Sequence, residues 1–303
     1  MLDLAELQHA LNASVLAAMG LAALIGLQIG SFINLLVWRL PQMMQHDWER
    51  EWVEYQSQQQ SELQGQQQGY QTVEQAQPIP VFNLSFPASH CTACQTPLRA
   101  RELVPVLSFL FLKGRCAYCH TAISWRYPLV ELAVAALWAC CAWRWGISAQ
   151  ALAWAGYATV LLALGLIDAD TMLLPDSLTL PLVWAGLLLA AGGVISVSLE
   201  HSVWGAALGY LTLWLVQTVF GLVTGKQGMG QGDFKLLAAL GAWLGWMALP
   251  AVVLCASVSG VGVALAMRWR GHLQAGQPLP FGPALVFAGL LFAFTSSSAW
   301  LIS

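Results

Sequence analysis

Charged residues are scarce in this sequence. Only 9% of its 303 residues are charged, 12 basic and 15 acidic, against about 25% in an ordinary soluble domain. This scarcity excludes a typical soluble globule. Apolar residues make up 58% of the chain instead, which predicts a polytopic membrane protein with lipid as its first partner. The net charge of −3 says little about other partners, and nothing in the pattern points to nucleic acid.

Long apolar runs recur along the chain. Most are about 18 to 22 residues long, the length that spans a bilayer as a helix. The longest run, Leu236 to Met267, contains Pro250 and would overshoot the bilayer as one helix, so we interpret it as two short spans joined by a tight turn. The sequence therefore predicts an all-α fold of about eight transmembrane helices: Leu11–Val37, Pro128–Trp145, Ala149–Ile167, Leu178–Val197, Val203–Val223, Leu236–Leu249, Ala251–Met267 and Gly282–Ile302.

The basic residues orient these helices, because lysine and arginine are enriched in cytoplasmic loops. With eight spans and a periplasmic N-terminus, 11 of the 12 basic residues are cytoplasmic and only Arg144 lies outside. With seven spans, Arg268 and Arg270 would move to the outer face, so we favour eight. The first residues, MLDLAEL, are acidic and no cleavage site is clear, so we do not expect a cleaved signal peptide.

The chain divides into three parts. Residues 1–38 form the first transmembrane helix, residues 39–127 a long cytoplasmic loop, and residues 128–303 a membrane domain of seven helices. The first part of the loop, residues 42–77, contains 13 glutamines and six acids against one arginine. Such a segment buries too little apolar surface to offset its ordering entropy. We interpret it as a solvated linker, although its acids could weakly attract a basic substrate segment.

The second part of the loop, residues 88–122, contains two CxxC pairs. Cys91 and Cys94 form one pair, Cys116 and Cys119 the other, and 21 residues separate the pairs. Four thiolates at this spacing can close a tetrahedral site around one zinc ion, and disulfides are not expected in the reducing cytoplasm. Because four protein ligands leave no open coordination position, we expect a structural zinc site. Four unliganded thiols are the alternative.

The first span carries polar residues on one side. Gln28, Ser31 and Asn34 recur every three residues, and Gly26 and Gly30 have the spacing that lets two membrane helices approach closely. Helix packing alone is the leading interpretation. A direct role in a site is the alternative.

Two acidic motifs lie at the cytoplasmic face in this arrangement. Asp168 directly follows the third span in LGLIDADTMLLPD, and Asp233 lies just before the sixth in GMGQGDFK. A carboxylate at a membrane edge is costly unless it is paired or hydrated, and two together can act as general acid and general base, as in aspartic proteases. Gly230 and Gly232 allow a peptide to pass close to Asp233. On the residues alone, Asp233 could instead be a helix N-cap.

Three neighbouring charges leave alternatives open. Asp170 could be a cap, a supporting partner or the catalytic acid itself, and Asp176 is placed to cap the fourth span. Lys235 could favour the ionised form of Asp233 or simply mark the cytoplasmic boundary.

Together these motifs resemble the bacterial prepilin leader peptidase and N-methyltransferase family, which belongs to the GxGD-type intramembrane aspartic proteases. The similarity extends over nearly the whole chain, through GSFINLLVWRLP, the double CxxC loop, RYPLVEL and both acidic motifs. The resemblance implies an inner-membrane enzyme that cuts the basic leader from type IV prepilins or pseudopilins and then methylates the new N-terminal residue. It assigns the catalytic acids to Asp168 and Asp233, the zinc site to the four cysteines, and the methyl donor role to S-adenosylmethionine.

No motif identifies the methyl-donor site, because no glycine-rich strand-to-helix loop is present. Gly114, in LKGRC, and Glu131, at the start of the second span, are candidate contributors. Glu131 could equally be a hydrogen-bonding residue at the membrane edge.

Two rival functions are weighed against this one. An ion-coupled transporter also places acids within the membrane, although usually near its midplane. A non-catalytic assembly scaffold could dock through the zinc loop, but it leaves both acidic motifs unexplained. Oligomeric state, and the choice between pilins and pseudopilins, are left open by the sequence.

Overall fold

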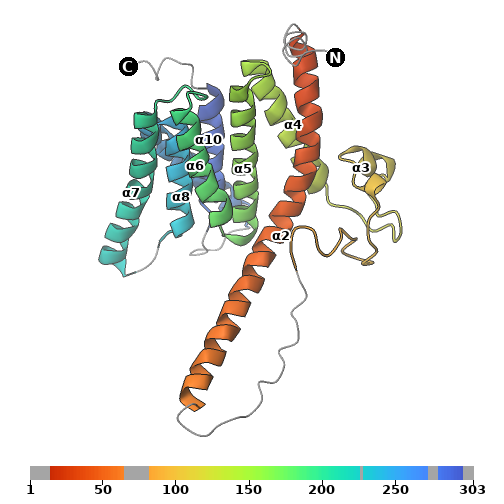
Figure 1. Ribbon diagram of the computed structural model, residues 1–303, viewed down its shortest axis with the longest axis horizontal. Helices are drawn as coiled ribbons and strands as arrows, with labels where there is room; N and C mark the ends of the chain where they lie inside the picture. The colour runs from red at the N-terminus through yellow and green to blue at the C-terminus, as the bar shows by residue number, and fades with distance from the viewer. Residues whose placement is uncertain (1–13, 65–81, 226–227, 272–278, 296–303) are drawn as a thin grey trace.

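A computed structural model describes residues 14–64, 82–225, 228–271 and 279–295, and the regular structure of these residues is helical. Figure 1 shows a helical bundle with a small appendage, carrying α3, beside α2 and α4. The all-α prediction is confirmed. The elements are α2 (Val15–Gln64), η1 (Ala100–Glu102), α3 (Leu107–Phe111), α4 (Arg126–Trp145), α5 (Ala149–Thr171), α6 (Asp176–Ala191), α7 (Leu199–Thr224), α8 (Gln231–Leu244), η2 (Trp246–Ala248), α9 (Leu249–Trp269) and α10 (Gly282–Thr295).

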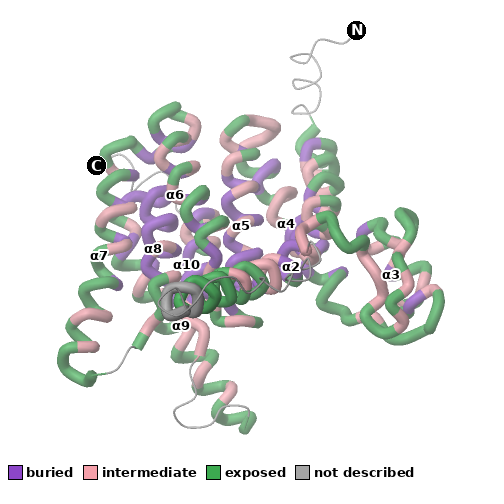
Figure 2. The backbone as a smooth tube through the Cα atoms, turned by 60° about the horizontal axis from the view of Figure 1, so that its bottom comes forward, coloured by how far each residue is buried: buried purple, intermediate pink, exposed green. Residues whose placement is uncertain are grey.

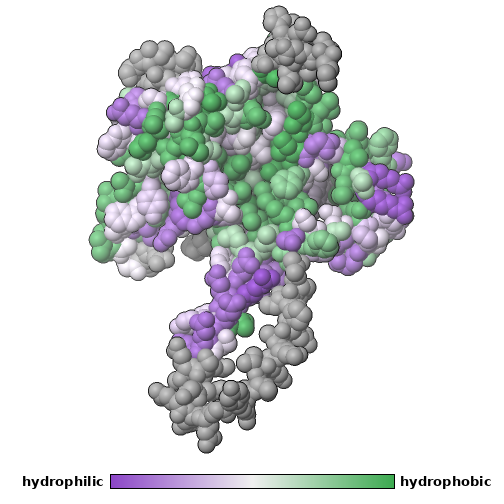
Figure 3. Space-filling view, in the orientation of Figure 1, coloured by the Kyte–Doolittle hydropathy of each residue, from purple (hydrophilic) through white to green (hydrophobic). Residues whose placement is uncertain are grey.

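Several of these helices are long and apolar enough to cross a bilayer. Among the described residues there are four: Val15–Gln59 within α2, α5, α7, and Trp246–Trp269, which joins η2 to α9. The shorter helices α6 and α10 are also apolar. Figure 3 shows a largely hydrophobic surface over the bundle. These helices are those of a membrane protein.

The break predicted around Pro250 is confirmed, and it lies slightly earlier than expected. α8 ends at Leu244, and Gly245 follows with a φ of 80°, a backbone conformation that glycine adopts readily. Pro250 stands in the first turn of α9, where its missing N–H costs no helical hydrogen bond. The run from Leu236 to Met267 is therefore two helices.

α8 is the central helix of the bundle. Eleven of its 14 residues are buried, as expected for a helix that is apolar on all sides, and it packs against α6, α7 and α10. Its contact with α7 is close because Gly205 and Gly241 meet backbone to backbone, leaving no room for a Cβ at either position. Figure 2 shows the buried residues gathered along α5, α8 and α10.

The apolar part of α2 packs along α4 through two glycines. A Cβ on Gly26 would lie 2.8 Å from the Cα of Ala135, and one on Gly30 would lie 2.7 Å from the Cα of Glu131. The two backbones can approach this closely only because both positions are glycine. The close packing predicted for this spacing is confirmed.

The glutamine-rich segment differs from the expected linker in the part that the structure describes. α2 continues through it as far as Gln64 and projects beyond the bundle (Figure 1). Residues 51–59 are exposed, and Figure 3 shows the projection as hydrophilic. Glutamine and glutamate favour helix, and extending an existing helix needs no new nucleus, so this segment is helical without burying apolar surface. Residues 65–77 lie outside the described residues.

Charged side chains tie several helix ends together. Arg126, at the start of α4, pairs with Asp170, near the end of α5, and Lys235 of α8 pairs with Asp176, at the start of α6. Gly282, the first residue of α10, bonds to α5 as well. The starts of α4, α6, α8 and α10 therefore lie at the same end of the bundle as the end of α5, and this end contains the acidic motifs.

Candidate functional site

Asp168 lies near the C-terminal end of α5 and is only 4% exposed. Its Oδ2 atom accepts a hydrogen bond of 2.9 Å from the backbone N–H of Gly282. A Cβ on Gly282 would lie 2.5 Å from that same oxygen, so only glycine lets the start of α10 approach the carboxylate this closely. The start of α10 thus fixes the orientation of the Asp168 carboxylate.

Asp233 is the third residue of α8 and is 8% exposed. Gly230 occupies the N-cap position of this helix, so the alternative of an Asp233 N-cap is not realised. The Oδ1 atom of Asp233 is buried and has no hydrogen-bond partner among the described residues. Asp168 and Asp233, 65 positions apart in the sequence, are thus both buried at the same end of the bundle.

Glycine also lets the start of α8 approach the segment after α5. A Cβ on Gly232 would lie 2.7 Å from the Cβ of Leu174, whereas a Cβ on Gly230 would meet nothing within 4 Å. Gly232 is therefore required by packing in the resting protein. Gly230 stands in open space at the N-cap of α8, three residues before Asp233.

The neighbouring acids have basic partners of their own. Arg126 donates to both carboxylate oxygens of Asp170, at 2.9 and 2.6 Å. The Nζ atom of Lys235 lies 2.7 Å from both oxygens of Asp176, so Lys235 is directed to that acid and not to Asp233. Asp176 is the first residue of α6 and Pro175 occupies its N-cap position, so the predicted Asp176 cap is wrong. Of the acids in the two motifs, Asp168 and Asp233 are the buried ones.

The two cysteine pairs form two turns of the same shape, which we call knuckle 1 (residues 90–98) and knuckle 2 (residues 115–123). In each, the N–H of the first cysteine donates to the threonine five residues later, and its carbonyl accepts from the residue four positions later. The bonds are Cys91 N–H to Thr96 O (3.0 Å), Gln95 N–H to Cys91 O (2.9 Å), Cys116 N–H to Thr121 O (2.9 Å) and His120 N–H to Cys116 O (3.1 Å). An isolated antiparallel bridge closes each turn, His90 with Pro97 and Arg115 with Ala122.

The four thiols converge. Their Sγ atoms all lie within 4.8 Å of one another, and those of Cys91 and Cys119 are 3.8 Å apart. Thiolates bound tetrahedrally at about 2.3 Å from one zinc ion would be separated by about 3.8 Å. The cluster, formed by Cys91, Cys94, Cys116 and Cys119, therefore fits a structural metal site.

Each knuckle also prepares its second cysteine as a thiolate. The hydrogen bond between the Cys94 thiol and the Thr96 hydroxyl lowers the pKa of that thiol. The equivalent bond between Cys119 and the Thr121 hydroxyl, with the Thr121 N–H, lowers the pKa of Cys119 to about 6. Thiolates are the form that binds metals. The matching C-x-x-C-x-T pattern is thus part of the metal site, and sequence analysis had used only its cysteines.

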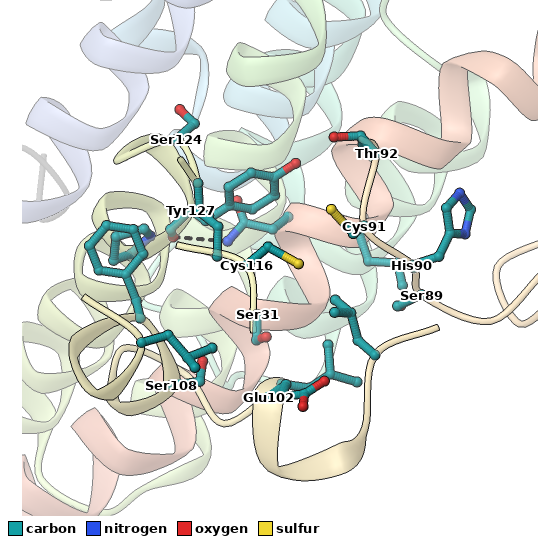
Figure 4. A pocket seen from close by; sticks show the side chains of 18 of the residues that line it. Ser31, Ser89, His90, Cys91, Thr92, Glu102, Ser108, Cys116, Ser124 and Tyr127 are labelled. Carbon is teal, nitrogen blue, oxygen red and sulfur yellow. Dashed lines mark hydrogen bonds between the residues drawn. The ribbon is translucent and has the colours of Figure 1, made fainter. Parts of the chain in front are cut away.

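A cavity of about 640 Å³ lies between the two knuckles, α2 and α4 (Figure 4). The polar side of α2 lines it, with Gln28, Ser31 and Asn34, and Tyr127 and Glu131 of α4 contribute the adjoining wall. The alternative of a site role for the polar residues of the first span therefore gains a structural basis. The backbone carbonyl of Tyr127 accepts a 3.0 Å hydrogen bond from the Asn34 amide.

Glu131 fastens the knuckle part to α4. Its Oε2 atom accepts a 2.7 Å hydrogen bond from the N–H of Val106. Val106 has a φ of 58°, which is unfavourable for a β-branched residue, so this bond holds a strained turn in place. Gly114 does not line the cavity. It lies behind Phe109, in the wall of a second cavity of about 410 Å³.

Comparison with known proteins agrees with this arrangement. Residues 24–145 match the Bacterial Peptidase A24 N-terminal domain, and residues 155–265 match the Type IV leader peptidase family. A relative from Stutzerimonas stutzeri is 45% identical over 272 residues, 88% of this chain and 87% of the relative. One from Burkholderia pseudomallei (strain K96243) is 45% identical over 304 residues, 97% and 94% of the two chains. One from Neisseria gonorrhoeae is 41% identical over 283 residues, 93% and 92%.

The chain belongs to the type IV leader peptidase family. All three relatives carry the name "Prepilin leader peptidase/N-methyltransferase". No solved structure matches the chain. The family predicted from the sequence motifs is confirmed.

The two family matches divide the chain between its two candidate sites. The N-terminal match contains the apolar part of α2, both knuckles and α4, and therefore the metal cluster and the larger cavity. The second match contains Asp168 and Asp233. Gly282, which bonds to Asp168, lies beyond both.

Sequence analysis missed two residues that shape the candidate sites. Gly282 carries no reactive group, and its only signal is its place at the start of an apolar run. Arg39 is 3% exposed and donates to the carbonyls of Asn83, Leu84 and Pro87, so it holds the segment before knuckle 1 against α2. An arginine directly after an apolar run was the available signal.

Proposed function

We propose that this protein removes the leader peptide from type IV prepilins or pseudopilins and then methylates the new N-terminal residue. One observation carries the peptidase half: Asp168 and Asp233 are both buried at one end of the bundle, and a buried oxygen of Asp233 has no partner there. An unpartnered carboxylate oxygen in a shared site suits a water molecule or a peptide better than it suits a purely structural role. The names of the relatives support the same assignment.

The chemistry follows from the two carboxyl groups. One of them accepts a proton from a water molecule, whose oxygen attacks the carbonyl carbon of the peptide bond that joins the leader to the mature chain. The other donates its proton to the leaving nitrogen, so the C–N bond breaks and an amine and a carboxyl group are formed. Gly282 holds the Asp168 carboxylate, and the open space at Gly230 gives the peptide room. This reaction requires neither a nucleophilic side chain nor a catalytic metal.

The proposed membrane arrangement has eight spans, with the N-terminus periplasmic and both sites cytoplasmic. Its support is the distribution of the basic residues and the gathering of alternate helix ends around the acids. A bacterial inner membrane is the location that fits a leader on the cytoplasmic side of a hydrophobic segment. We also assign residues 1–38, 39–127 and 128–303 to the first helix, the cytoplasmic loop and the membrane domain.

Zinc is the metal that we propose for the four cysteines. Four thiolates, two CxxC pairs and the short Cys91–Cys119 separation all suit it. Because the four ligands complete a tetrahedron, the ion would hold the two knuckles together and take no part in hydrolysis. S-adenosylmethionine is the methyl donor that the second half of the function requires, and it would supply an electrophilic methyl group.

One reaction mixture tests the proposal. The detergent-purified protein is mixed with a prepilin that carries its leader, and the products are followed by mass spectrometry. We expect loss of the leader, and in the presence of S-adenosylmethionine a further gain of one methyl group at the new N-terminus. An intact prepilin after prolonged incubation with folded protein would refute the peptidase assignment.

The same preparation separates the rival functions. Reconstituted into liposomes, an ion-coupled transporter would carry ions across the membrane and leave the prepilin intact. A scaffold would bind the prepilin without cutting it. The position of the two acids at one end of the bundle favours the peptidase over the transporter.

A further inference from the structure

We propose that α3 and the turn before it dip into the cytoplasmic leaflet of the bilayer, and that the two basic residues after α3 bind anionic lipid headgroups. The inference goes beyond the proposed function and rests on the proposed membrane arrangement, not on either activity. Residues 103–112 of the cytoplasmic loop are LVPVLSFLFL, and eight of these ten residues are apolar. Neither the two acids nor the metal cluster accounts for so apolar a stretch.

The outer side of this segment is apolar and uncovered. Leu107, Leu110 and Phe111 of α3 are all more than half exposed, and Phe111 is 83% exposed. Their spacing places them on one face of the helix. Trp125, which is 67% exposed, lines the second cavity together with Leu110, so the apolar surface continues to the start of α4. Proteins rarely leave an apolar surface of this kind against water, so it requires a cover.

The depth of α3 shows which cover is available. The residue before α3, Val106, donates its N–H to Glu131, the sixth residue of α4 and therefore ~8 Å along that helix. Gly30 packs against the Cα of Glu131 and lies seven residues, or ~10 Å, before the predicted end of the first span at Val37. The hydrocarbon core is ~30 Å thick. α3 thus begins at the level of the cytoplasmic half of the bilayer, and Figure 1 shows its part of the chain alongside α2 and α4.

The charges beside this surface fit lipid headgroups. Lys113 and Arg115 follow α3, are exposed, and line the second cavity together with Trp125. Neither forms an ion pair with any residue that the structure describes. Basic and tryptophan side chains are enriched where a chain passes from hydrocarbon to headgroups, and basic ones attract anionic lipids. Lys113 and Arg115 therefore select an anionic leaflet.

A second copy of the chain fits this surface less well than lipid does. A symmetric contact would place the same patch on both copies, so it would bring Lys113 and Arg115 close to their own equivalents. Lipid brings opposite charge to the same place. Figure 3 shows hydrophobic and hydrophilic areas on separate parts of the appendage, as a segment half in lipid requires. The metal part is then held from two sides, by Glu131 through Val106 and by lipid through α3.

Photolabelling from the lipid side tests the insertion. The full chain is reconstituted into vesicles of phosphatidylcholine and phosphatidylglycerol that contain a lipid with a photoreactive diazirine in its acyl chain, and labelled peptides are identified by mass spectrometry. We expect label on residues 107–111 and on the exposed Leu215 and Val219 of α7, and none on the buried Leu161 of α5. Label on α7 with none on residues 103–112 would overturn the proposal. If that preparation still cuts prepilin, the proposed function stands without it.

An acidic substitution at the tip of α3 gives the second test. Phe111→Asp removes an apolar ring and adds a charge that hydrocarbon disfavours, so labelling of residues 103–112 should fall by at least ~10-fold. Trp52→Asp is the matched control, because Trp52 is an exposed aromatic residue on the projecting part of α2. Its labelling of residues 103–112 should equal that of the parent, and metal content shows whether the knuckles remain folded in both variants. Should Phe111→Asp lose its metal, the labelling of the parent decides.

Headgroup selection is measured with the same photoreactive chain on two different headgroups. Phosphatidylglycerol should label residues 103–125 of the parent at least ~5-fold more than phosphatidylcholine does, because each basic residue near the surface favours anionic lipid. The double variant Lys113→Gln, Arg115→Gln should lose this preference. Arg50→Gln, the same change on the projecting part of α2, should keep it. Equal labelling of the parent by the two lipids would overturn the assignment of Lys113 and Arg115.

Discussion

The Arg126 guanidinium donates one hydrogen bond to each carboxylate oxygen of Asp170. Both side chains are more than a third exposed, so the pair contributes little to stability, about 0.2–1 kcal/mol. The pair matters because of its position. It joins the start of α4, which borders the cavity, to the end of α5, which carries Asp168. Arg126 also engages Asp170, the other acid of the IDAD segment, which could otherwise take the role of Asp168.

Asparagine at either buried acid tests the catalytic pair. Asp168→Asn and Asp233→Asn keep the shape of the side chain but can neither take up nor deliver the proton that hydrolysis needs. We expect initial rates of leader removal to fall by at least ~100-fold in each, because positioned acid and base groups contribute ~10²–10⁴-fold. Cleavage of purified prepilin in detergent measures the rates, and both variants should remain in the membrane fraction.

Asp170→Asn is the matched control for this pair. It lies two residues from Asp168 and changes the same chemical group, but its carboxylate is engaged by Arg126 and stands outside the buried site. Its rate should stay within ~10-fold of the parent, since an exposed ion pair is worth little. An inactive Asp170→Asn beside an active Asp168→Asn would reverse the assignment of the first catalytic acid.

The parts of this structure that sequence could predict each have a local signal. The apolar runs predict α5 and α7, Pro250 predicts the break before α9, and the CxxC spacing predicts that the four cysteines lie together. Ion-pair partners have no such signal. Asp170 and Arg126 are 44 residues apart, and Asp176 and Lys235 are 59 apart, so only the folded chain selects these pairs from the other charges at the same end of the bundle.

The projecting half of α2 shows a different limit of the sequence. Its composition correctly indicated a segment that buries little, but burial and helix formation are separate properties. A helix that has already formed continues through glutamine and glutamate while its side chains stay exposed, as it does over residues 51–59. Composition alone cannot distinguish such a solvated helix from an irregular linker.

Alanine at Gly282 should disturb Asp168 without touching either acid. The new Cβ would lie 2.5 Å from the Asp168 Oδ2 atom, so the carboxylate must turn away or α10 must shift. We expect leader removal to slow by at least ~10-fold, a loss of about 1.4 kcal/mol in transition-state stabilisation. Gly260→Ala on the facing helix α9 is the control, because its Cβ would make only an ordinary 3.5 Å contact. Equal rates for the two variants would show that the start of α10 does not position Asp168.

Removal of one cluster cysteine should release the metal. The purified protein is expected to contain one zinc ion per chain by elemental mass spectrometry, and Cys116→Ser should lose most of it because three thiolates and a hydroxyl bind zinc poorly. Cys255→Ser is the control, since this cysteine lies in α9 far along the chain from the cluster. A metal-free parent protein that remains folded would contradict the zinc assignment.

Alanine at Gly30 should separate α2 from α4. Its Cβ would lie 2.7 Å from the Cα of Glu131, which is backbone and cannot swing aside. We expect Gly30→Ala to lower the free energy of unfolding by about 1–3 kcal/mol through overpacking, and to lower the melting temperature in detergent accordingly. Gly20→Ala in the same helix meets nothing within 4 Å and should leave the melting temperature unchanged or slightly raised, because alanine restricts the unfolded chain more than glycine does. Equal melting temperatures for the two variants would show that the close contact of Gly30 with Glu131 does not hold α2 against α4.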